Sequence, residues 1–174
     1  MLKIRSIDSV DALKMAIQCK IDMKNFYEKA STLVKNDDAV AILKGLAEKE
    51  EAHRQRLIKV YSKLSGKKIL YLNLGRKHKL NTLVKCEDDP NEAVRAAKKN
   101  EAEIRNFLIT ISRRLYEADL RQFFRQLAME EEQHLALLES SFEEPLNLDE
   151  EPTREDNDSM REIASADRDQ VKTW

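Results

Sequence analysis

The chain of 174 residues contains little glycine, proline or cysteine. Three glycines and three prolines are too few for the turns of a protein built from many short strands, so the composition favours long helices. The two cysteines, Cys19 and Cys86, form no CxxC pair, which excludes a metal site made of four thiolates. No apolar run is long enough to cross a bilayer, so we expect no membrane-spanning segment.

We expect no targeting signal at the beginning of the sequence. The first ten residues, MLKIRSIDSV, have neither the hydrophobic core nor the small-residue cleavage site of a signal peptide. We therefore expect a cytoplasmic protein with no membrane partner. Two isolated cysteines fit this compartment, because cytosolic thiols stay reduced.

Charged residues are abundant, at 36% of the chain, and they are distributed unevenly. Residues 1–142 carry 27 basic and 21 acidic side chains, whereas residues 143–174 carry 4 basic and 11 acidic ones. The second segment has few large apolar residues, so it cannot bury enough surface to offset the entropy of ordering it. We predict one folded domain in residues 1–142, followed by an acidic, disordered tail in residues 143–174.

The folded domain shows four stretches with the apolar spacing of amphipathic helices. They cover residues 9–35, 38–64, 90–116 and 119–142. Breaks of two or three residues join the first helix to the second and the third to the fourth, which implies antiparallel neighbours. More than twenty residues separate the second helix from the third. The prediction is an all-α fold, an antiparallel four-helix bundle made of two helical hairpins joined by a long crossover.

The crossover is basic and has no acidic residue before Glu87. Basic loops can bind nucleic acid, but this one lacks interleaved aromatic residues and a known binding motif, so we expect no nucleic-acid partner. The apolar residues 69–74 form either a short strand or a cover over the bundle, and His78 is expected at the surface.

The motif Glu-x-x-His occurs twice, as Glu50–His53 and Glu131–His134, at an offset of 81 residues. Other residues repeat at the same offset: Ala12 with Ala93, Ala16 with Ala97, Phe26 with Phe107, Leu46 with Leu127, and Leu57 with Leu138. Duplication of a helical hairpin is the simplest explanation. Residues three apart share one face of a helix, so each motif can direct a carboxylate and an imidazole to one point. Two such helices facing each other supply the ligands of a dinuclear metal centre.

These features resemble the rubrerythrin and bacterioferritin branch of the ferritin-like superfamily over roughly residues 8–142. The resemblance rests on the paired Glu-x-x-His motifs and on a pattern, A-x-x-x-E-x-x-x-x-x-F-Y, in the first helix of each hairpin. In the first hairpin of this chain the pattern reads Ala16, Lys20, Phe26 and Tyr27. Nothing in the sequence matches the rubredoxin domain of longer rubrerythrins. The resemblance implies a ferritin-like bundle with a di-iron carboxylate centre.

The resemblance also implies a role for each matching residue. Glu50 and Glu131 would bridge two iron ions. His53 and His134 would each bind one ion through a ring nitrogen, and Glu101 would be the terminal carboxylate of the second ion. Manganese or zinc in place of iron is the alternative.

Lys20 departs from the family pattern, because it stands where the first iron would have its own terminal carboxylate. A protonated ammonium has no lone pair to bind a metal, and its charge opposes a cation nearby. We predict either one well-occupied metal or a weak, asymmetric pair. One alternative is that the ammonium takes the place of the first metal and leaves the centre metal-free. Another is that Lys20 lies at a bundle end and extends into solvent.

The expected function is an iron-dependent redox protein that reacts with peroxide or dioxygen, an oxidoreductase of peroxidase or ferroxidase type. Ile104 stands where rubrerythrins carry a further acid, which argues against peroxide reduction by two irons. Tyr27 is expected either to hydrogen-bond a ligand carboxylate or to pack in the core. The expected partners are metal ions, an electron-donor protein, and further copies of the chain in a homodimer or small homo-oligomer. The rival is a bundle that has lost catalysis and serves as a scaffold or regulatory binding protein.

Overall fold

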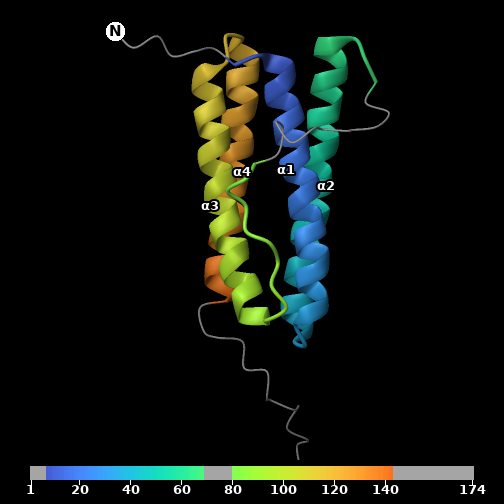
Figure 1. The fold of residues 1–174 in the computed structure, drawn as a ribbon, viewed down its shortest axis with the longest axis vertical. Helices are drawn as coiled ribbons and strands as arrows, with labels where there is room; N and C mark the ends of the chain where they lie inside the picture. Colours follow the sequence, from blue (N-terminus) through green and yellow to red (C-terminus); the bar gives the residue numbers. More distant parts are fainter. Residues whose placement is uncertain (1–6, 69–79, 143–174) are drawn as a thin grey trace, which may run out of the picture.

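The computed structural model describes residues 7–68 and 80–142, which form four long helices and no strand. The helices are α1 (Ser9–Leu33), α2 (Asp37–Ser65), α3 (Pro90–Arg114) and α4 (Ala118–Ser141). They run antiparallel to their neighbours in a bundle, with the hairpin α1–α2 beside the hairpin α3–α4 (Figure 1). The predicted all-α four-helix bundle is therefore confirmed. The predicted strand and His78 in the crossover, and the predicted tail, lie outside the described residues.

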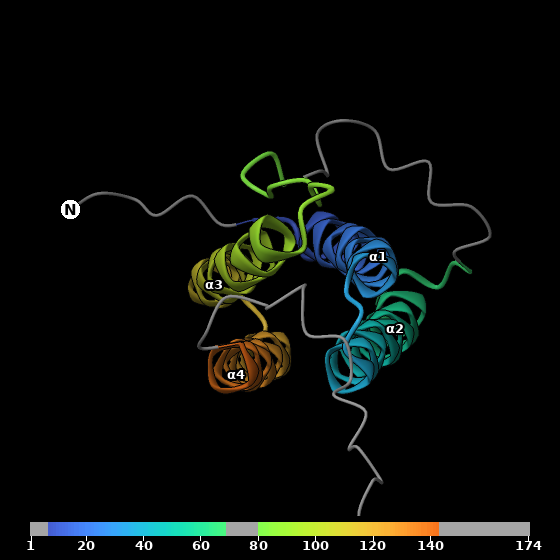
Figure 2. The same ribbon diagram turned by 90° about the horizontal axis from the view of Figure 1, so that it is seen from below.

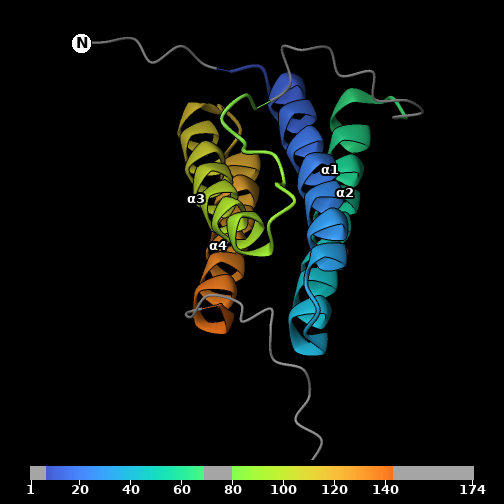
Figure 3. The same ribbon diagram turned by 60° about the horizontal axis from the view of Figure 1, so that its bottom comes forward.

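The arrangement of the helices follows from where each hairpin turns. Figure 2 shows α1 next to α3, and α2 across from α4. The end of α2 and the beginning of α3 lie at opposite ends of the bundle (Figure 1), and Figure 3 shows residues 80–89 running beside α3. This is the connectivity of a ferritin-like fold.

Short polar side chains begin three of the helices. Asp8, Asn36 and Asp89 each accept a hydrogen bond from a backbone amide of the first turn, at 2.9, 3.0 and 2.8 Å. Such caps satisfy donors that the helix itself leaves unpaired. At the other end of α2, Gly66 has a φ of 67°, a left-handed conformation that suits glycine at the end of a helix. The predicted helix starts near residues 9, 38 and 90 agree with these caps.

The core is built from the apolar faces of all four helices. Its largest fully buried apolar side chains include Leu13, Ile17, Leu43, Leu46, Ile104, Leu108, Phe124 and Leu127. Phe124 is buried, and Phe123 packs against the core from a half-buried position. Both cysteines are free thiols, Cys19 buried and Cys86 half-buried. None of the four helices is long and apolar enough to span a membrane.

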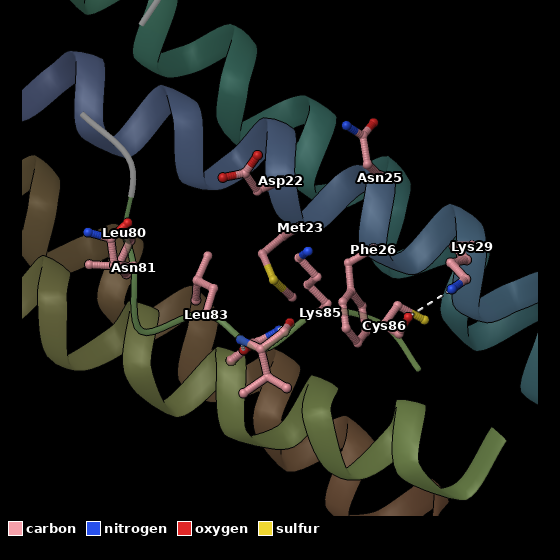
Figure 4. A pocket seen from close by; sticks show the side chains of 12 residues that line it. Asp22, Met23, Asn25, Phe26, Lys29, Leu80, Asn81, Leu83, Lys85 and Cys86 are labelled. Atoms are coloured by element: carbon pink, nitrogen blue, oxygen red, sulfur yellow. Dashed lines mark hydrogen bonds between the residues drawn. The ribbon is translucent and has the colours of Figure 1, made fainter. Parts of the chain in front are cut away.

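The end of the crossover is held against α3 by Asn100. The side-chain amide of this buried residue donates to the carbonyl oxygen of Val84 at 2.9 Å and accepts from the amide of Val84 at 2.8 Å. Between this segment and α1 lies a hollow of about 550 Å³. Figure 4 shows Met23 and Phe26 of α1 directed toward the crossover segment that faces them.

We expect Asn100→Ala to loosen this segment and to lower the free energy of unfolding by about 1–3 kcal/mol, because two backbone groups lose their partners. Hydrogen exchange at the Val84 amide, together with urea unfolding, measures both effects. Asn25→Ala is the matched control, because Asn25 is exposed and lines the same hollow. Unchanged protection of the Val84 amide in Asn100→Ala would contradict the assignment.

Candidate metal centre

The five predicted ligands come from three helices and converge in the middle of the bundle. Glu50 and His53 lie on α2, Glu101 on α3, and Glu131 and His134 on α4. All five are buried, and none is more than 5% exposed. The three-residue spacing places each Glu-x-x-His motif on one face of its helix, and the faces of α2 and α4 are turned toward each other. The imidazole rings of His53 and His134 stack across that gap with centroids 5.3 Å apart.

Lys20 enters the same interior from α1. Its side chain has no exposed surface, and its Nζ lies 2.9 Å from Oε2 of Glu50 and donates a hydrogen bond to Oε2 of Glu131. The alternative of a solvent-extended Lys20 is therefore wrong. Burial alone would lower the pKa of Lys20, but the carboxylates of Glu131, Glu50 and Glu101 outweigh burial and raise that pKa above its ordinary value. The side chain is a charged ammonium at neutral pH.

Burial and Lys20 act in opposite directions on Glu131. Burial favours the neutral carboxyl, whereas Lys20 and then His53 favour the carboxylate, so the pKa of Glu131 lies well below its ordinary value. A buried carboxylate that keeps its charge needs a cation close to it. In the metal-free protein, Lys20 is that cation.

Tyr27 organises the opposite side of the cluster. Its hydroxyl is buried and donates a hydrogen bond to Oε1 of Glu101, so the predicted contact with a ligand carboxylate is present. His134 Nδ1 lies 3.2 Å from Oε1 of Glu50 and 3.8 Å from Oε1 of Glu101. Burial raises the pKa of Glu101 to about 7. Burial lowers the pKa of His134, but the nearby carboxylates of Glu101 and Glu50 outweigh burial and raise that pKa to about 9.

His53 makes contacts that differ from those of His134. Its Nδ1 lies 3.1 Å from Oε1 of Glu131, while its Nε2 lies 2.6 Å from Oε2 of Glu130. Arg56 in turn donates to the same oxygen of Glu130 at 2.6 Å. Reasoning from the repeat missed Glu130 and Arg56, because the residues 81 positions away, Lys49 and Leu137, are of other types. The helical spacing of Arg56 three residues after His53 was the available signal.

Four of the side chains form a group that fits a metal ion. One ligand atom from each of Glu50, Glu101, Glu131 and His134 lies within 4.8 Å of all the others. Both oxygens of Glu50, one oxygen each of Glu101 and Glu131, and Nδ1 of His134 are buried and make no hydrogen bond, although all but the Glu101 oxygen lie within 3.2 Å of an ion-pair partner. Buried polar atoms normally make hydrogen bonds, so this many without one in a single place suit a cation. Carboxylate oxygens with an imidazole nitrogen are donors for iron, manganese or zinc.

His53 stands apart from this group of four, although its Nδ1 is also buried without a hydrogen bond. Ile104, one turn after Glu101, is fully buried and apolar, so it adds no donor to the centre. The hollow beside the crossover is separate too, since none of the five predicted ligands is among the described residues that line it.

Comparisons with known proteins agree with this architecture. The rubrerythrin family model matches residues 11–141. None of the curated proteins matches the chain. Among solved structures, a hypothetical protein from Pyrococcus furiosus is similar, with a TM-score of 0.62 and 25% identity over 78% of this chain and 89% of that one.

Proposed function

The chain belongs to the rubrerythrin family, and from that premise and the geometry of its buried cluster we propose that it is an iron-binding redox protein. The iron would react with peroxide or dioxygen. The observation that carries the proposal is the convergence of Glu50, Glu101, Glu131 and His134, with inward atoms that lack hydrogen-bond partners. Lys20 offsets only part of the charge of the three buried carboxylates, and because burying uncompensated charge is costly, a cation at the centre would stabilise the arrangement.

The chain supplies the surroundings that such chemistry needs. Bound iron would provide one-electron chemistry and a Lewis acid at the centre. Tyr27 holds Glu101 in position, and a proton on its hydroxyl is available beside that carboxylate. The four helices exclude bulk water from the cluster, because its side chains are at most 5% exposed. Low polarity around the centre strengthens every electrostatic contact inside it.

We expect Glu101→Ala and His134→Ala each to weaken ferrous ion binding by about 100-fold or more, since each removes a direct ligand and second-sphere changes alone cost about 10- to 100-fold. Anaerobic titration with Fe(II), together with the metal content of the purified protein, measures this. The control is Glu132→Ala, because Glu132 lies on α4 but is 60% exposed and pairs with Arg105. Equal binding by the control and the two variants would rule out the site.

A second candidate function has an observation in its favour. Lys20 already forms ion pairs with Glu50 and Glu131, so a metal-free cluster is partly neutralised. In that case the protein would be a scaffold or regulatory binding protein. Reaction of the iron-loaded protein with hydrogen peroxide or dioxygen, followed by the growth of ferric absorption, separates the two functions. A protein that holds no iron and shows no oxidation supports the scaffold.

A further inference from the structure

The two hairpins repeat each other at the surface. Nζ of Lys24 in α1 lies 3.5 Å from Oε2 of Glu51 in α2. The corresponding residues 81 positions later form the same contact, with Nη2 of Arg105 in α3 lying 3.3 Å from Oε1 of Glu132 in α4. The same pair of opposite charges therefore joins the helices of each hairpin. Because this contact is repeated in both hairpins, residues 81 positions apart can be compared directly between the two halves of the centre.

Around the centre the two halves have diverged. Glu101, which faces His134, corresponds to Lys20 in the first hairpin. Glu130, which contacts His53, corresponds to Lys49 in the first hairpin. The two halves thus differ by two charge reversals, and in both of them the first hairpin carries the lysine and the second the glutamate.

The charges of the buried cluster determine how many metal ions it can hold. Glu50, Glu101 and Glu131 carry three negative charges as ligands, and Lys20 carries one positive charge, which leaves two negative charges. One divalent cation neutralises that remainder. A second would leave two uncompensated positive charges in the interior, which is strongly unfavourable.

A carboxylate in place of Lys20 would change this balance by two units, the charge of one divalent ion. The position of the ammonium agrees with this charge balance. Its Nζ contacts Oε2 of both Glu50 and Glu131, which are the two carboxylates expected to bridge a pair of metal ions. A second ferrous ion would need these same two oxygens as ligands, so it would have to displace the ammonium.

We infer that Lys20 takes the position of one metal ion, and that its charge difference from a carboxylate equals the charge of that ion, so that the centre takes a single divalent ion, held on the side of Glu101 and His134. This inference rests on the proposed function and specifies its stoichiometry. His53 is then a positioning residue rather than a ligand. Its Nε2 is bound to Glu130, which Arg56 fixes in turn, and the imidazole supports Glu131 from outside the group of four.

The two histidines provide a matched test. Anaerobic titration with Fe(II) should give one ion per chain for the parent protein and for His53→Ala, and none at the same concentrations for His134→Ala. In a symmetric centre with two ions, both variants would lose one ion each. Two ions in the parent, or equal losses in the two histidine variants, would therefore overturn the inference.

Substitutions of Lys20 test the replacement itself. Lys20→Glu should raise the capacity from one ion to two, and the double variant Lys20→Glu/His53→Ala should return to one, because the added site needs His53. Lys20→Met removes the charge without adding a ligand, so it should still bind one ion, about tenfold more tightly or better. If Lys20→Glu does not fold, the affinity of Lys20→Met for the metal still tests the role of the ammonium. Co(II), bound anaerobically, reports the number and ligand geometry of the ions by its visible absorption.

The outcomes separate this inference from the proposed function. A parent protein that binds neither Fe(II) nor Co(II) at the cluster contradicts both. A parent protein with one ion, and a folded Lys20→Glu variant that also binds only one, keeps the metal centre but overturns the role given to Lys20. Lys14→Glu controls for the change in net charge, because Lys14 lies on the same helix, is partly exposed and contacts only Asp11 among the ion pairs described.

Discussion

Replacing Glu131 with alanine should lower the free energy of unfolding of the metal-free protein by about 3–5 kcal/mol, the usual cost of breaking a buried ion pair from one side. Glu131 is fully buried, accepts a hydrogen bond from Lys20 and lies 3.1 Å from His53. Its loss leaves the Lys20 ammonium in the interior with Glu50 as its remaining close partner. Urea unfolding in the presence of a chelator measures the change without a contribution from bound metal.

Two further variants test whether the broken ion pair with Glu131 is the cause. Glu132→Ala, next along the same helix, removes an exposed carboxylate and should change stability by about 0.5 kcal/mol or less. Lys20→Met/Glu50→Gln/Glu131→Leu removes Lys20 together with both carboxylates that it pairs with. This triple variant should recover at least about 2 kcal/mol relative to Glu131→Ala, because replacement of a complete buried ion pair by uncharged residues is often neutral or favourable. If the triple variant is as unstable as Glu131→Ala, lost packing rather than the broken ion pair explains the effect.

Phe124→Ala should destabilise the bundle by a similar amount, about 3–5 kcal/mol, through the cavity that it leaves. The Phe124 side chain has no exposed surface and meets the ring of Phe123 edge to face, with centroids 6.1 Å apart. Phe123 in turn lies under the guanidinium of Arg56, 5.7 Å from its ring centroid. Removal of Phe124 therefore affects the packing between α4 and α2 as well as the core.

The matched control for this cavity is Met129→Ala on the same helix. Met129 is 64% exposed, so its truncation should change the free energy of unfolding by about 0.5 kcal/mol or less. Thermal and urea unfolding of both variants give the comparison. A loss below about 1 kcal/mol in Phe124→Ala would mean that the core collapses around the missing ring, contrary to the close packing described.

Local signals were sufficient to predict the helices. Asp89 before Pro90 marks a helix start by itself, and Asn36 separates two apolar patterns that could not continue through it. The repeat of Glu-x-x-His then placed two ligand-bearing faces opposite each other. Their convergence is observed, while their binding of metal stays a prediction. The crossover was less predictable, because the contact of Asn100 with Val84 joins residues with no shared periodicity.

The position of Lys20 shows the limit of sequence reasoning most clearly. A lysine at this point of a helical repeat is compatible with an exposed, an end-of-bundle or a buried side chain, because lysine has a long flexible stem. The packing of α1 against α2 and α3, diagonally across the bundle from α4, placed its ammonium between two carboxylates. The contact between Glu130 and Arg56 could not be predicted from the sequence for a related reason. It joins α2 to α4, and neither residue has a counterpart of the same type in the other half of the repeat.

The sequence by itself determined the helical class, the duplicated hairpins and the residue types of the centre, because caps, apolar spacing and an 81-residue offset are properties of local order along the chain. Only the tertiary structure decided which charges face each other: that Lys20 meets Glu50 and Glu131 while Tyr27 meets Glu101. Electrostatic balance in a buried site depends on distances of a few ångströms between different helices, and those distances exist only once the bundle has closed.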